Sequence, residues 1–84
     1  MADGWHILGR CIEGQPLVID GVNVWDYEWD SLGDSVTLYD SYFGAEYEHR
    51  LWEIDAGGRR IAFGAGETSN NVWAFSVEGP TTST

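Results

Sequence analysis

The sequence contains no lysine, and four arginines oppose fourteen aspartates and glutamates, so the formal net charge of the 84-residue chain is −10 at pH 7. Binding to a nucleic-acid backbone needs clustered cationic side chains, and attraction to an anionic membrane surface needs a basic segment. This charge balance therefore argues against nucleic acids and membranes as partners. It favours a partner of opposite charge, such as a cationic protein, a metal ion or an amine.

Cysteine and long apolar runs are equally scarce. Cys11 is the only cysteine, so no internal disulfide is expected and no oxidising compartment is implied. The first ten residues lack the charged region and the long apolar run of a signal peptide, and no apolar stretch approaches the roughly 20 residues of a membrane-spanning helix. We therefore expect a soluble, cytoplasmic protein.

Residues that carry catalysis or bind metals are also few. Two histidines and one cysteine do not make a zinc spacing, and Cys11 with a histidine is a weak candidate for a nucleophile and its base. We expect His49 to be partly buried and hydrogen-bonded. The acids of residues 26–34 begin with the rhythm of a calcium loop, but Ser31 and Thr37 replace its glycine and its bidentate glutamate. We expect no enzyme activity, no cofactor and no assigned metal ligand, and leave open a weak divalent-ion site among clustered carboxylates.

Eleven glycines divide the chain into short runs rich in Val, Ile, Trp, Tyr and Phe, which is the pattern of short strands joined by turns. Short connections favour antiparallel neighbours. We predict a mainly β fold in which about six short antiparallel strands form a meander that curls into a small barrel or a half-open sandwich. One β domain is expected over residues 1–78 and a disordered tail over residues 79–84. The runs predicted as strands are residues 5–12, 17–19, 22–29, 36–39, 46–55, 60–64 and 71–78.

Several connections can be predicted from local sequence. The dipeptide Asp20-Gly21 indicates a type I′ turn, so residues 17–29 are expected to form a hairpin. The hydrophobic alternation slips by one residue at Val24–Trp25, which predicts a bulge or sharp twist there, or a strand covered on both faces. Residues 31–34 are predicted as a turn and residues 64–70 as a loop.

Residues 34–43 admit two interpretations. Val36–Tyr39 fits a short strand followed by a turn over residues 40–44. The alternative is the same β fold with one short helix over residues 34–43, although valine, threonine and tyrosine are poor helix formers. Residues 46–55 repeat the one-residue slip of hydrophobic alternation, which is consistent with a corner of a sheet.

Twelve aromatic residues can drive the folding of a small domain and leave some side chains for an interface. Between Trp25 and Asp30 aromatic and acidic side chains alternate. The aromatic side chains, including Tyr27 and Trp29, are predicted to be core or interface anchors, and the acids to form the opposite, solvated face. The predicted partner-binding residues are Asp26, Glu28, Asp30, Asp34, Glu46, Glu48, Trp5 and Trp52.

These features predict a small acidic, non-enzymatic interaction protein that binds a basic protein partner, as small acidic inhibitors and immunity proteins do. One alternative is a small-ligand module in which aromatics rimmed by carboxylates bind a sugar, an amine or a metal ion. The other is a structural subunit whose surplus aromatics form a homodimer.

Overall fold

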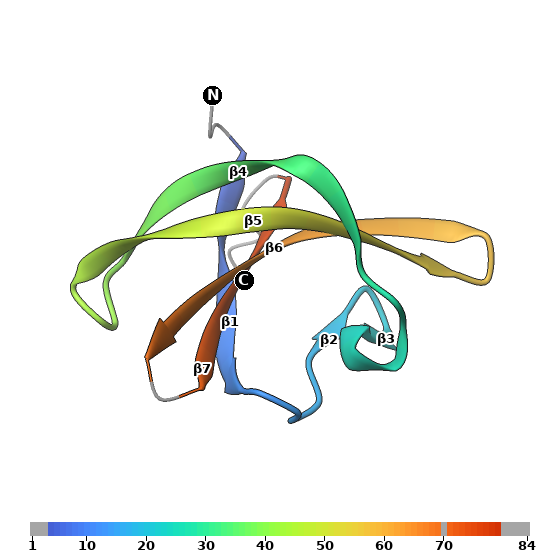
Figure 1. Ribbon diagram of the computed structural model, residues 1–84, viewed down its shortest axis with the longest axis horizontal. Coiled ribbons are helices and arrows are strands. Elements are labelled where there is room, and N and C mark those ends of the chain that lie inside the picture. Colours follow the sequence, from blue (N-terminus) through green and yellow to red (C-terminus); the bar gives the residue numbers. More distant parts are fainter. Residues whose placement is uncertain (1–3, 70, 80–84) are drawn as a thin grey trace.

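The computed structural model describes residues 4–69 and 71–79 and has a mainly β fold, as predicted (Figure 1). Most of the predicted tail, residues 80–84, lies outside the described residues. The elements are β1 (Trp5–Ile12), β2 (Val18–Ile19), β3 (Val22–Asn23), the 3-10 turn η1 (Val24–Asp26), β4 (Asp30–Asp40), β5 (Ala45–Ala56), β6 (Arg59–Ser69) and β7 (Val72–Glu78).

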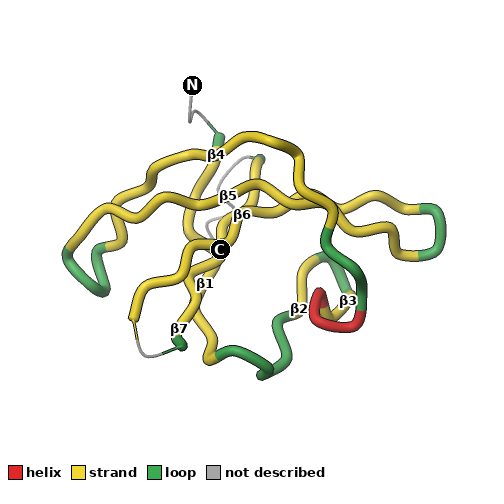
Figure 2. Tube along the Cα trace, viewed as in Figure 1, coloured by secondary structure: helices red, strands yellow, loops and turns green. Residues whose placement is uncertain are grey.

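The strands form one five-stranded antiparallel sheet in the order β1-β7-β6-β5-β4 and a separate two-stranded sheet of β2 and β3. Strands β4 to β7 are a meander, and β1 completes the large sheet beside β7. Figure 2 shows β4 and β5 arching across the molecule, with β2, β3 and η1 below one end of the arch. Because β1 and β4 are not hydrogen-bonded neighbours in the described sheet, the half-open sandwich is confirmed and the closed barrel is not.

The predicted hairpin at Asp20-Gly21 is present, but its second strand is shorter than predicted. Val18 pairs with Asn23 around this turn, whose φ angles of 53° and 88° are both positive, as a type I′ turn requires. The predicted strand over residues 22–29 is wrong beyond Asn23, because the chain turns into η1. The Asn23 side chain accepts a hydrogen bond from the Trp25 N–H, which caps this turn.

Two other boundaries differ from the prediction in the middle of the chain. Residues 31–34 are not a free turn but an irregular part of β4, where the register with β5 shifts between Ser31 and Ser35. The alternative helix over residues 34–43 is wrong, since β4 continues to Asp40 and its backbone bonds are made with β5. The predicted turn over residues 40–44 follows.

The predicted loop over residues 64–70 is also wrong, because β6 continues to Ser69. Gly64 and Gly66 are buried strand residues placed where larger side chains would collide. A Cβ atom on Gly64 would lie 2.3 Å from the Ser76 Oγ, and one on Gly66 would lie 2.8 Å from the carbonyl oxygen of Glu48. These glycines therefore permit close packing and do not interrupt the strand.

The slip of alternation in β5 is a change of covered face, not a bulge. Its pairing with β6 runs without a register shift from Arg50 to Ala56. His49 and Leu51 are buried on one face, while Ile54 is buried on the other. Buried residues therefore occur on both sides of β5, because each face of the sheet is covered by other parts of the chain.

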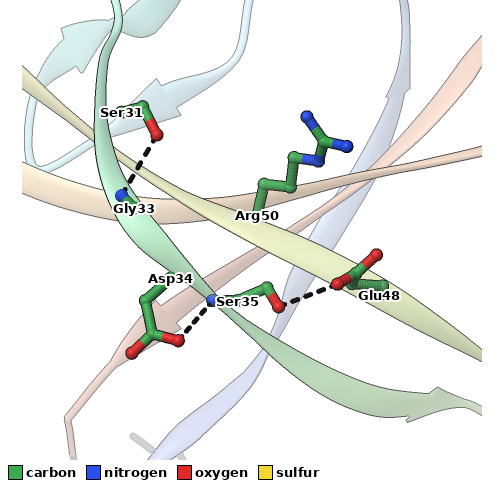
Figure 3. A pocket seen from close by; sticks show the side chains of 6 residues that line it. All are labelled: Ser31, Gly33, Asp34, Ser35, Glu48 and Arg50. Atoms are coloured by element: carbon green, nitrogen blue, oxygen red, sulfur yellow. Dashed lines mark hydrogen bonds between the residues drawn. The ribbon is translucent and has the colours of Figure 1, made fainter.

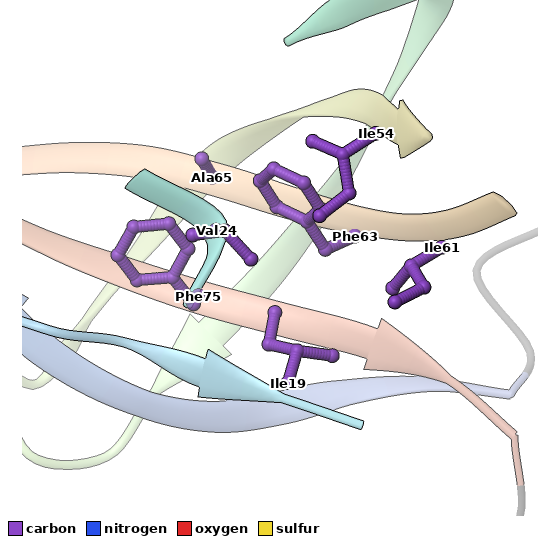
Figure 4. Close-up of a cluster of buried hydrophobic side chains, with 7 residues drawn as sticks. All are labelled: Ile19, Val24, Ile54, Ile61, Phe63, Ala65 and Phe75. Carbon is purple, nitrogen blue, oxygen red and sulfur yellow. The ribbon is translucent and has the colours of Figure 1, made fainter. Parts of the chain in front are cut away.

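One face carries the aromatic interior, the main hydrophobic core, which lies between the large sheet and the β2–β3–η1 segment (Figure 4). Trp29 is central to it: its ring centroid lies 4.8 Å from that of Phe63 and 4.9 Å from that of Trp25. The Trp29 Nε1–H donates to the Val24 carbonyl oxygen over 2.8 Å, so its polar atom is satisfied. The buried members of this cluster are Ile19, Val24, Ile54, Ile61, Phe63, Ala65 and Phe75.

The opposite face carries a polar interior, formed by Asp40, His49 and Ser76 together with Arg10. The first three side chains are completely buried. Arg10 on β1 donates through Nε and a terminal nitrogen to both oxygens of Asp40 at the end of β4. This ion pair therefore links the two outer strands of the sheet, which share no ladder in the described chain.

Candidate functional site

Three of the predicted acids come together where β4 and β5 are paired. Glu46 and Glu48 are both exposed and lie two residues apart on β5, so they point to the same side of that strand. Asp34 is exposed in the irregular part of β4 and borders the same hollow as Glu48. The Ser35 hydroxyl donates to the Glu48 carboxylate over 2.8 Å, which holds this side chain against β4 (Figure 3).

The other three predicted acids lie elsewhere. Asp26 and Glu28 are exposed at the end of η1 and in the segment after it. Asp30 lies opposite Glu53 in the ladder between β4 and β5, and Arg60 donates to Glu53 over 2.7 Å. The acids of residues 25–30 are exposed, as predicted, and Trp25 and Trp29 pack against the core, but Tyr27 is exposed and the acids do not join those of β5.

The two tryptophans predicted to remain partly exposed have different surroundings. Trp52 is half-buried on β5, with its ring centroid 5.9 Å from that of Trp29. Trp5 is half-buried at the start of β1, opposite Glu78. Trp52 is therefore the one that the fold places next to the acids of β5.

Two open hollows of about 310 Å³ each lie side by side on the face of β5 that carries Glu48 and Arg50, and both residues line each hollow. The serine hollow is shown in Figure 3 and is lined by Ser31, Gly33, Asp34, Ser35, Glu48 and Arg50. The tryptophan hollow is lined by Glu48, Arg50, Trp52, Ala65, Glu67 and Trp73.

The register of three strands builds the tryptophan hollow. Arg50 on β5 lies opposite the buried Ala65 on β6, and Glu67 on β6 lies opposite Trp73 on β7. Ala65 therefore forms the floor, with an indole supplied from β5 on one side and from β7 on the other. The acids and indoles come from sequence positions that are far apart, so only the folded sheet brings them together.

Glu67 and Trp73 were not among the predicted site residues. Glu67 falls in the segment predicted as a loop, and Trp73 falls in the last predicted strand, where nothing in the sequence marks it as part of a site. Continuous alternation from Ala65 to Glu67 is the signal that could have placed this carboxylate on a strand face. The Trp73 Nε1–H donates to the Glu13 carboxylate over 3.4 Å, which adds a further acid beside the hollow.

Arg50 is the only cation that lines either hollow. Within the described chain it is also the one arginine without an ion pair. The other pairs are Arg10 with Asp40, Arg59 with Asp20 and Arg60 with Glu53. The tryptophan hollow therefore combines two carboxylates, one unpaired guanidinium and two indoles.

The polar interior contains a serine, a histidine and an aspartate, which are the residue types of a hydrolytic triad, but their arrangement is unsuited to catalysis. The His49 Nδ1 lies 2.9 Å from the Ser76 Oγ, and the Asp40 carboxylate is bound by Arg10 and the Tyr42 N–H. All three triad-type side chains are completely buried, so no substrate reaches the hydroxyl. The prediction that His49 is hydrogen-bonded is confirmed, and the side chain is completely buried where partial burial was predicted.

Burial and charge set the ionisation of these groups. Burial lowers the pKa of His49 and the nearby Asp40 carboxylate only partly opposes this, so the ring is neutral. Burial raises the pKa of Asp40, but the hydrogen bonds and charge of Arg10, with the N–H groups of Tyr42 and Phe43, outweigh it and hold this pKa below its usual value. The polar interior is thus a buried ion pair beside a neutral imidazole.

Cys11 packs against the aromatic interior and is half-buried. Burial raises the pKa of its thiol. Because the thiolate is the nucleophilic form, this residue is a poor nucleophile at neutral pH.

Among residues 4–69 and 71–79, no three or more His, Cys, Asp or Glu side chains are grouped to hold a metal ion. No helix in the described part of the chain is long and apolar enough to span a membrane. Comparison of the chain with protein-family models, curated proteins and solved structures finds no match.

Proposed function

We propose that the protein is a non-enzymatic interaction protein that binds a basic protein partner through the acidic side of β5 and β6. The contact surface consists of Glu46, Glu48 and Glu67 with the indoles of Trp52 and Trp73. The observation that carries this proposal is the tryptophan hollow, where half-buried aromatic side chains lie beside carboxylates on neighbouring strands.

Two physical effects support a protein as the partner. A net charge of −10 attracts a cationic surface over distance and raises the rate of association at low salt. Tryptophan is enriched among the residues that contribute most to interface affinity, which are well packed and desolvated once the partner is bound. The free thiol of Cys11 fits a reducing compartment, so the cytoplasm is part of the same proposal.

The proposal is tested by comparing two triple variants that change the net charge equally. One carries Glu46→Gln, Glu48→Gln and Glu67→Gln, and the other carries Asp26→Asn, Glu28→Gln and Asp30→Asn. Biosensor binding to a panel of small basic proteins, at low and at physiological salt, should be reduced about tenfold or more by the first triple. The second triple should mainly slow association.

If the two triple variants weaken binding equally, the partner is attracted by net charge alone. The assignment of the contact surface to β5 and β6 would then be wrong. No binding by the unmodified protein to any basic protein at low salt would overturn the function itself.

A second candidate function is a module for a small cationic ligand, because indole faces and carboxylates also bind free amines. Tryptophan fluorescence titration with alkylamines and sugars at low salt separates the two candidates. Saturation at micromolar amine would favour the small-ligand module, and its absence would favour the protein partner.

A further inference from the structure

We infer that the tryptophan hollow receives a single arginine side chain of the partner. This inference rests on the proposed function and names the group recognised at its centre. It depends on the size of the hollow, on its walls and on the position of the one cation inside it.

The size of the hollow suits a side chain. Its volume of about 310 Å³ lies at the lower end of the roughly 300–1,000 Å³ typical of small-molecule sites. Its floor is the small, buried side chain of Ala65, which leaves the space between the indoles of Trp52 and Trp73 open. An extended side chain with a planar end can enter such a space, whereas a drug-sized ligand would be only partly covered.

The chemistry of the walls favours a guanidinium group over an ammonium group. A guanidinium is planar, stacks on aromatic faces and donates hydrogen bonds to carboxylates in a fixed fork. Trp52 and Trp73 supply the aromatic surfaces, and Glu48 and Glu67 supply the acceptors from adjacent strands.

Both carboxylates can accept further hydrogen bonds in the free protein. Glu48 accepts one hydrogen bond from Ser35, and an ionised carboxylate has about four lone-pair sites. Glu67 makes no side-chain hydrogen bond to another described residue and is exposed.

Arg50 opposes the binding of a cation in the tryptophan hollow. It borders the hollow without an ion pair in the described chain, so its charge repels an incoming cation and competes for the same carboxylates. Replacing it by a neutral residue should therefore strengthen the binding of a cation. For a ligand that is anionic, the same replacement should weaken binding.

The experiment uses three short blocked peptides that differ only in their central residue: arginine, lysine or citrulline. Citrulline has nearly the shape of arginine without its charge. Binding is followed by ¹⁵N NMR of the indole N–H signals and by tryptophan fluorescence of the full chain. We expect the arginine peptide to shift the signals of Trp52 and Trp73, the lysine peptide to bind several-fold more weakly, and the citrulline peptide to leave them unchanged.

Single variants test the walls. Glu48→Gln and Glu67→Gln should each weaken binding of the arginine peptide about 5-fold or more, as expected for loss of a charge-assisted hydrogen bond. Arg50→Gln should strengthen it about 2- to 5-fold, on the scale of one exposed charge interaction. Glu78→Gln is the matched control, because this acid is exposed at the end of β7, outside both the hollow and the proposed contact surface, and it should change binding less than 2-fold.

The outcomes separate this inference from the function on which it rests. Equal binding of the arginine and citrulline peptides, equal binding of the arginine and lysine peptides, or weaker binding after Arg50→Gln would each overturn the inference. If basic proteins bind through Glu46, Glu48 and Glu67 while the arginine peptide leaves both indole signals unchanged, the inference fails and the proposed function stands. If the peptide binds as expected but no basic protein does, the proposed function fails and the arginine site stands.

Discussion

The aromatic interior on one face of the sheet and the polar interior on the other share strands β5 and β7, but the polar interior also draws Arg10 from β1 and Asp40 from β4. On the first face, Trp29 meets Phe63 and Phe75 edge to face, and the rings of Phe63 and Phe75 are tilted against each other with centroids 6.2 Å apart. On the second, a buried carboxylate, an arginine and an imidazole depend on a few specific hydrogen bonds. The sheet therefore divides the molecule into two cores of different chemistry.

The difference predicts two kinds of sensitivity. An apolar core gains a small amount of free energy from each of many contacts. The stability lost on truncating a side chain there therefore follows the volume of the atoms removed. A buried polar group has few partners, and losing one leaves the other desolvated and unpaired. The His49 Nε2 already has no hydrogen-bond partner in the described structure. Loss of a further hydrogen bond in this interior would therefore leave a second buried polar atom unpaired.

The largest effect is expected in the aromatic interior. Phe63→Ala should lower the free energy of unfolding by about 3–5 kcal/mol, because it removes a completely buried ring next to Trp29. Urea unfolding followed by circular dichroism measures the change. Tyr39→Ala is the control, since this ring is 61% exposed and its loss should cost under about 0.5 kcal/mol. Similar costs for the two variants would refute the division into core and surface.

Removing the charge partner of Asp40 should be nearly as costly. Arg10→Met keeps much of the side-chain length but leaves a buried carboxylate uncompensated. We expect a loss of about 2–4 kcal/mol, below the 3–5 kcal/mol of a fully buried pair because Arg10 is 27% exposed. The double variant Arg10→Met, Asp40→Asn should recover part of this loss, because asparagine can still accept from the Tyr42 N–H. A double variant that is less stable than Arg10→Met alone would contradict the assigned pairing.

A smaller loss is expected where the polar interior is packed most tightly. Gly64→Ala places a methyl group 2.3 Å from the Ser76 Oγ, and we expect it to cost about 1–3 kcal/mol as the hydroxyl shifts away from His49. Gly9→Ala is the matched control in a strand, because a Cβ there meets nothing within 4 Å. The thermal unfolding midpoints of the two variants should therefore separate clearly, and coincident midpoints would show that Gly64 is not needed for packing.

The smallest expected effect is a pH dependence confined to the polar interior. The pKa of His49 is lowered by folding, so the unfolded chain binds a proton more readily and stability falls as the pH drops below about 6.5. The pKa of Asp40 is also lowered, so a further loss follows below about pH 4.

His49→Gln should make the urea midpoint less dependent on pH between 7 and 5 than that of the unmodified protein. An unchanged slope in His49→Gln would show that this imidazole does not couple to folding.

Local signals in the sequence were sufficient for the parts of the fold that local interactions determine. The Asp20-Gly21 turn needs only two residues that tolerate positive φ, and the structure has this turn. The length of β6 could not be predicted in the same way. Gly64 and Gly66 are typical of a loop in isolation, and only their contacts with His49 and Ser76 in the folded sheet explain why they are strand residues.

The candidate site was predictable to a similar extent. The acidity of Glu48 and the partial exposure of Trp52 follow from composition and alternation, and both residues line the tryptophan hollow. Glu67 joins them only because β6 is longer than its local sequence indicates. The position of Asp30 opposite Glu53 depends on the register shift in β4, which no nearby residue specifies.

The pairing of β1 with β7 has a consequence for how the chain folds during synthesis. Trp5 finds its ladder partner in Glu78, and the Gly79 N–H donates to the Gly4 carbonyl oxygen over 2.8 Å. A ribosome synthesises β1 long before β7, so β1 has no strand to pair with while β4 to β6 form. Sheets with such distant partners form slowly and leave apolar edges open in the meantime. A nascent chain that ends before β7 is therefore expected to be a chaperone client, and its release to coincide with the arrival of the last strand.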